Sequence, residues 1–160
     1  MGKRFKAQSA MEYLMTYGWA ILIIAVVLGA LFSLGVFSGT SLLGTTCIAS
    51  SGYYCSDLVL HGGTLSFNFG QSTGVNWVAA NVFYLPSGSA APSSVPSNCV
   101  ESYPSGISSG QIVQQVSLSG CGLPTTAGGT TAGSIWAEYQ TTAGGTQYFT
   151  QTATLTAKAS

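Results

Sequence analysis

The residues of this 160-residue chain that could carry out catalysis are few. His61 is the only histidine, and Asp57 precedes it by four residues. With one of the many serines, this pair would supply the nucleophile, base and orienting group of a hydrolase. The geometry is wrong if the segment is a strand, and a histidine directly before Gly62 and Gly63 is typical of a turn. We therefore predict no catalytic residues and no enzymatic activity.

Glycine pairs and cysteines are the next candidates, for cofactor or metal binding. Gly128-Gly129 and Gly144-Gly145 lack the lysine and the strand-to-helix context of a phosphate-binding loop, so we interpret both as hairpin turns. The cysteines form no Cys-x-x-Cys pair, and a single histidine is available, so a zinc site is not expected. The sequence predicts neither a cofactor nor a metal.

The four cysteines, Cys47, Cys55, Cys99 and Cys121, are better explained as disulfides. Four cysteines allow three pairings. We favour Cys47 with Cys55 and Cys99 with Cys121, because each pair closes a short, turn-rich loop and requires no distant strands to meet. In an oxidising compartment each disulfide would typically contribute about 2 to 4 kcal/mol of stability.

Residues 40 to 160 have the size of one small domain. Leu65, Phe67 and Phe69 alternate with polar residues, as they do when one face of a strand lies on a core. Six or seven short strands of this kind, separated by Gly, Pro, Ser and Asn clusters, predict an immunoglobulin-like antiparallel β-sandwich. The expected strands lie at 57–60, 64–69, 75–85, 111–118, 134–139 and 147–156, with long loops at 86–97 and 124–133.

A different kind of segment precedes this domain. From Tyr13 to Phe37 the chain carries no charge, and Thr16 and Ser33 are its only aliphatic hydroxyls. As a helix rising about 1.5 Å per residue, it would exceed the ~30 Å hydrocarbon core of a bilayer. The basic residues before it should remain cytoplasmic, which would place the following domain outside the cell. The fold class is therefore α+β, with one long hydrophobic helix followed by the β-sandwich.

The start of the chain carries a more specific pattern. Residues 6–14 read Lys-Ala-Gln-Ser-Ala-Met-Glu-Tyr-Leu and run directly into the apolar segment. They resemble the class III signal peptides of archaeal type IV pilins, which a prepilin peptidase processes. The C-terminal residues 151–160 also look similar to the ends of such pilins.

This resemblance implies a division of the chain into three parts. The peptidase would cut between Ala7 and Gln8, so residues 1–7 would be a cleaved leader. Residues 8–39 would form the assembly or transmembrane helix, and residues 40–160 the extracellular pilin domain.

Cleavage would also remove three of the four basic residues. A chain that begins at Gln8 keeps only Lys158 against four acidic residues, which are Glu12, Asp57, Glu101 and Glu138. No basic patch would remain to neutralise phosphates, so nucleic-acid binding is not expected.

Glu12 is the one acid within the hydrophobic segment. Left unpaired in hydrocarbon, its carboxylate would cost several kcal/mol. The nearest cation after cleavage is the α-amine of Gln8, in the same subunit or in a neighbouring one. The positive end of the helix dipole also favours an acid there, and a simple capping role at the helix start is the alternative.

Farther along the same helix, small residues recur at intervals of four. Ala25, Gly29 and Ser33 lie on one stripe, which lets neighbouring helices approach closely. Outside a bilayer, a wholly apolar helix persists only by packing against copies of itself. Gly35 and the Ser38-Gly39 pair are expected to end the helix.

These features together predict the structural subunit of an archaeal type IV adhesion pilus. It would lie in the cytoplasmic membrane before assembly and in an extracellular filament afterwards. Its partners would be copies of itself, the prepilin peptidase and the pilus assembly machinery. The alternative is a membrane-anchored surface binding module or minor pilin, whose first sugar-binding candidates would be Trp136 and Tyr139 unless these are core residues.

Overall fold

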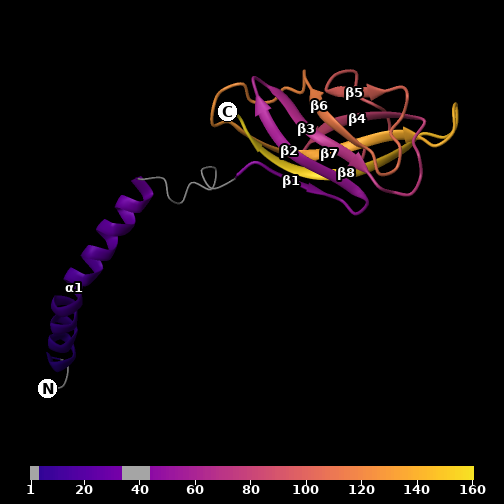
Figure 1. Ribbon diagram of the computed structural model, residues 1–160. Helices are drawn as coiled ribbons and strands as arrows, with labels where there is room; N and C mark the ends of the chain where they lie inside the picture. The colour runs from indigo at the N-terminus through magenta and orange to yellow at the C-terminus, as the bar shows by residue number, and fades with distance from the viewer. Residues whose placement is uncertain (1–3, 34–43) are drawn as a thin grey trace. The chain divides into compact units, whose positions relative to one another are not determined.

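The structure, a computed structural model, describes residues 4–33 and 44–160. Figure 1 shows one α-helix, α1 (Arg4–Ser33), and an antiparallel β-sandwich. The chain divides into two compact units, Met1–Leu42 and Leu43–Ser160. This is the α+β fold class that the sequence predicts, with a long apolar helix followed by a sandwich.

Helix α1 forms from a sequence without proline, in which good helix formers such as Ala, Leu and Met recur. The stretch Met15–Ser33 has a mean hydropathy of 2.2 and is long and apolar enough to cross a membrane. The predicted end of the helix at Gly35 to Gly39 lies outside the described residues.

The sandwich consists of two antiparallel sheets. One has five strands in the order β1-β8-β7-β4-β5, and the other has three in the order β2-β3-β6. A tight hairpin at Gly62-Gly63 connects β2 with β3, and a longer hairpin loop, residues 141–147, connects β7 with β8. The strands are β1 (Thr46–Ala49), β2 (Tyr53–His61), β3 (Thr64–Gln71), β4 (Ala79–Pro86), β5 (Val100–Tyr103), β6 (Ile112–Leu118), β7 (Thr130–Gln140) and β8 (Tyr148–Lys158).

The core lies between the two sheets. As the alternation predicts, Leu65, Phe67 and Phe69 of β3 are at most 1% exposed. Alternate residues of the facing strands, such as Val82 in β4 and Ile135 in β7, are buried against them in one cluster. Burial of these side chains is the main term that stabilises a domain of this size.

One polar side chain inside the domain is fully satisfied. Gln71 is 2% exposed, and its Nε2 donates to the carbonyl oxygens of Val75 and Ile107 at 2.9 and 3.0 Å. Its Oε1 accepts from the backbone and the hydroxyl of Thr73. Gln71 therefore connects the end of β3 to the Val75 segment and to Ile107, whose carbonyl oxygen also accepts from the Trp77 amide.

Three sequence predictions about the sandwich are wrong in detail. The described part of the structure has eight strands, not six or seven. Strands β1 and β5 were missed because four residues are too few to show a period. The expected loop 124–133 is partly strand, since β7 begins at Thr130. Gly128-Gly129 is no hairpin turn, because it lies between β6 and β7 of different sheets and pairs with the backbone of Ala159.

Candidate functional site

Apolar side chains cover all sides of helix α1. From Met11 to Ser33 every large apolar residue whose side chain is described is exposed, apart from the half-buried Leu31. A surface helix of a globular domain would instead have one polar face. The exposed residues include Met15, Trp19, Ile21, Leu22, Ile23, Ile24, Val26, Val27, Leu28 and Phe32.

The two aliphatic hydroxyls in the described apolar stretch Met15–Ser33 are satisfied within the helix. Thr16 Oγ1 donates to the carbonyl oxygen of Glu12 at 2.8 Å, and Ser33 Oγ donates to that of Ala30 at 2.8 Å. Neither hydroxyl needs water, so both are compatible with an apolar environment.

The predicted stripe of small residues lies on this exposed surface. Ala25, Gly29 and Ser33 are all exposed, and a Cβ placed on Gly29 would meet no atom within 4 Å. Gly18, two turns before Ala25, continues the stripe, although a spacing of four residues alone does not predict it. The signal that could have found it is the seven-residue spacing from Gly18 to Ala25, which is two helical turns.

The predicted processing residues and Glu12 lie in the first three turns of α1. The helix begins at Arg4, so Ala7 and Gln8 belong to its first turns and Glu12 follows eight residues after the start. Glu12 is exposed. In the uncleaved chain Glu12 therefore lies beyond the first helical turn, to which the effect of the helix dipole is largely confined. A helix that starts at Gln8 would bring the Glu12 carboxylate to within about one turn of the positive end of the dipole.

Both predicted disulfides are present. Cys47 of β1 is bonded to Cys55 of β2, with the Cα atoms 5.9 Å apart. Cys99, directly before β5, is bonded to Cys121, shortly after β6, with the Cα atoms 4.6 Å apart. Since β1 and β5 are the edges of one sheet and β2 and β6 the edges of the other, each disulfide closes one side of the sandwich.

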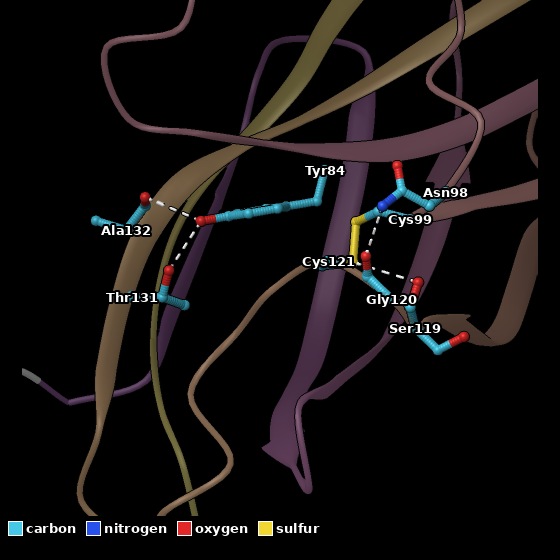
Figure 2. Close-up of a disulfide and its surroundings, with 8 residues drawn as sticks. All are labelled: Tyr84, Asn98, Cys99, Ser119, Gly120, Cys121, Thr131 and Ala132. Atoms are coloured by element: carbon cyan, nitrogen blue, oxygen red, sulfur yellow. Dashed lines mark hydrogen bonds between the residues drawn. A yellow bond between two sulfur atoms is a disulfide. The ribbon is translucent and has the colours of Figure 1, made fainter.

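Hydrogen bonds reinforce the second disulfide (Figure 2). The Cys99 amide donates to the Ser119 carbonyl oxygen at 3.1 Å, and Asn98 Nδ2 donates to the Gly120 carbonyl oxygen at 2.9 Å. In the same view the Tyr84 hydroxyl lies near β7, within 2.9 Å of Thr131 Oγ1 and 3.1 Å of the Ala132 carbonyl oxygen. These contacts connect the start of β5 to the end of β6, and β4 to the start of β7.

Asp57 and His61 do not form a pair. Asp57 Oδ2 accepts from Asn68 Nδ2 at 2.6 Å and from the Ser56 hydroxyl at 2.8 Å. His61 ends β2, and its Nδ1 lies 3.2 Å from the carbonyl oxygen of Ser160. Among the described residues, no group of three His, Cys, Asp or Glu side chains is placed to hold a metal ion.

The two aromatic residues proposed as sugar contacts are half-buried. Tyr139 stacks on Trp77, with ring centroids 4.4 Å apart, and packs against the core. Trp136 donates from Nε1 to the Ser134 hydroxyl at 2.9 Å. Tyr139 thus serves the core, as the alternative reading held.

Two tyrosines of this domain, Tyr103 and Tyr139, have raised pKa values. Burial, and then the nearby Glu101 carboxylate, raise the pKa of Tyr103 well above its usual range. The Tyr103 hydroxyl is buried without a hydrogen bond of good geometry, while Glu101 accepts from the Ser117 amide. Burial also raises the pKa of Tyr139.

An apolar helix long enough to cross a membrane and two disulfides fit a membrane-anchored or exported protein. No protein-family model matches the chain, and no curated protein matches it either.

Proposed function

We propose that this chain is the structural subunit of an archaeal type IV adhesion pilus. The observation that carries the proposal is the surface of α1, on which apolar side chains are exposed all around while the β-sandwich has a complete core of its own. Such a helix is stable only in lipid or against other apolar helices. The leader-like residues 6–14 favour packing against other apolar helices as the final arrangement.

In this proposal the helices of many subunits pack together and the β-domains form the outside of the filament. The stripe of Gly18, Ala25, Gly29 and Ser33 would let neighbouring helices approach closely. Before assembly the same helix would lie in the cytoplasmic membrane. A prepilin peptidase would remove residues 1–7, because three buried cations would strongly destabilise a filament core.

Glu12 would guide the entry of each subunit. After cleavage its carboxylate and the new α-amine of Gln8 are the ionisable groups at the front of the helix, and in an apolar bundle each needs the other. Glu12→Gln keeps the size and removes the charge, so it should leave the β-domain folded and reduce the number of filaments. Glu101→Gln, at a partly exposed carboxylate of the β-domain, is the control for loss of one carboxylate.

The first experiment is mass spectrometry of the N-terminal residue in filaments sheared from the producing cells. Gln8 at the start of an intact filament subunit is the expected result. Met1 in membranes, with no subunit in the sheared fraction, would exclude the pilus proposal. It would favour the alternative of a membrane-anchored surface binding module.

A further inference from the structure

The outer face of the three-stranded sheet β2-β3-β6 has an unusual backbone. Because Leu65, Phe67 and Phe69 of β3 point into the core, the residues between them, Ser66 and Asn68, point outward. Both neighbouring strands lose their register beside this part of β3. Such irregularities re-aim side chains and are frequent near functional sites.

The two irregularities lie on opposite sides of Asn68. In β2 the register shifts between Ser56 and Val59, and Asp57 within this stretch has a φ of 52°. In β6 the shift falls opposite Phe67 and Phe69, and Gln115 there has a φ of 58°. Left-handed backbone is costly for residues other than glycine and persists where the surrounding structure enforces it.

Asn68 holds both irregular strands in place. Its Nδ2 donates to Asp57 Oδ2 at 2.6 Å, and its Oδ1 accepts from the Gln115 amide at 3.0 Å. One carboxamide on the central strand therefore fixes the bulges on both sides. The result is a rigid arrangement rather than two independent loops.

A hollow of about 550 Å³ lies over this arrangement. Asp57, Gln114 and Gln115 are among the residues that line it. In the described part of the chain, the second carboxylate oxygen of Asp57 and the side-chain carboxamides of both glutamines have no hydrogen-bond partner. Val59, which is 49% exposed, contributes an apolar patch. The hollow thus presents free donors and acceptors, a single negative charge and no positive charge.

A second hollow of about 440 Å³ continues along the same face. Tyr54, Gly70 and Ile112 are directly opposite one another across the three strands. Gly70 forms the floor, because a Cβ there would come within 3.3 Å of both neighbouring side chains. Tyr54 and Ile112 stand on either side, 45% and 51% exposed. Asn68 and Gly70 are two residues apart on β3, about 7 Å, so the hollows are adjacent.

The outer face of the five-stranded sheet differs. Phe83 of β4 and Glu138 of β7 belong to that face, since their neighbours Val82 and Ala137 point into the core. Yet they are 0% and 3% exposed, and Asn81 Nδ2 donates to the Glu138 carboxylate at 2.6 Å. Other parts of the domain therefore cover much of that face.

We infer that the outer face of β2-β3-β6 binds an uncharged oligosaccharide. A sugar ring has an apolar face, which packs on an aromatic ring such as that of Tyr54, and hydroxyls that pair with carboxylates and carboxamides. Asp57, Gln114 and Gln115 supply such groups on a backbone that is already fixed. Anionic glycans and phosphates are disfavoured, because no lysine or arginine lines either hollow.

This binding site does not depend on filament formation. The experiment uses the full-length chain in a detergent without a sugar headgroup, applied to an array of neutral and acidic glycans. We expect retention on neutral oligosaccharides. Tyr54→Ala should weaken that binding about tenfold, and Gln114→Ala should weaken it several-fold.

The control residues lie on the five-stranded sheet and match Tyr54 and Gln114 in residue type and exposure. Tyr148 is 47% exposed against 45% for Tyr54, and Gln151 is an exposed glutamine on β8. Tyr148→Ala and Gln151→Ala should change binding less than twofold, and all four variants should keep the melting temperature of the parent chain within a few degrees.

Three outcomes would overturn the inference. They are no retention on any neutral glycan, retention on acidic glycans only, and equal weakening by Tyr54→Ala and Tyr148→Ala. The presence or absence of sheared filaments is read separately, so failure of this inference and failure of the pilus proposal are distinguishable.

Discussion

Helix α1 and the β-domain place their apolar residues in opposite ways. In α1 the large side chains lie outside, whereas in the domain Leu65, Phe67 and their neighbours lie inside a closed core. The domain is also closed covalently on both sides. One chain therefore contains a part that is complete by itself and a part that requires another apolar surface.

The largest expected loss of stability comes from a glycine-to-alanine substitution in the β-domain, and the same substitution in α1 is its control. Gly106 has a φ of 71°, and a Cβ on it would overlap the Trp77 carbonyl, which accepts from the Ile107 amide. Gly106→Ala should destabilise the domain by about 4 kcal/mol, because steric overlap and left-handed backbone both oppose it. Urea denaturation of the full chain in detergent, followed by tryptophan fluorescence, measures this.

Gly29→Ala is the control for that experiment. Gly29 is helical and a Cβ on it would meet nothing within 4 Å, so the domain should keep its stability within about 0.5 kcal/mol. In an isolated helix alanine is favoured over glycine by about 1 kcal/mol. An equal loss of domain stability in both variants would contradict the division into two independent parts.

Removal of the disulfides should act on the domain alone. Each bond should contribute roughly 3 kcal/mol, and Cys99–Cys121 slightly more than Cys47–Cys55, because its cysteines are 22 rather than 8 positions apart in the sequence. Paired Cys→Ser variants, compared by urea midpoint, measure the two contributions. The helical circular dichroism signal of α1 in detergent should not change. A parallel loss of this signal would contradict the independence of α1 and the β-domain.

Loss of the buried Gln71 side chain should come next. Gln71→Ala removes four hydrogen bonds and leaves the carbonyls of Val75 and Ile107 without this donor, which should cost about 2 to 3 kcal/mol. Gln151→Ala, on the exposed side of β8, should cost less than about 0.5 kcal/mol. Thermal melting of both variants tests the difference.

The smallest effect is a loss of stability at high pH. The raised pKa of Tyr103 means that the folded domain favours the neutral phenol. Stability is therefore fully present below the unfolded pKa of about 10 and falls as the pH rises above it. Tyr103→Phe should reduce this alkaline slope. Melting temperatures between pH 8 and 11 provide the test.

Much of this fold could be predicted from local patterns. The alternation of Leu65, Phe67 and Phe69 was visible because one face of β3 is buried along its length. The disulfides followed from short loops between cysteines. Strands β1 and β5 were missed, since four residues carry too little periodicity and their identity depends on pairing with β8 and β4.

The binding face could not be predicted in the same way. Asp57, Asn68 and Gln115 are far apart in the sequence and meet only through the pairing of three strands. The one local signal was Asp57-Leu-Val-Leu60, where three apolar residues in a row break the alternation that a regular strand would show. A bulge explains that break, but the sequence does not say which side chains it brings together.

The position of Cys47 determines how the domain would carry a mechanical load. Any tension that reaches the domain along the chain from α1 enters β1 at Thr46, one residue before the disulfide. From there it passes through hydrogen bonds to β8 in one sheet and through a covalent bond to β2 in the other. Strand β1 therefore cannot peel away beyond its first residue, and both sheets share the force from the outset.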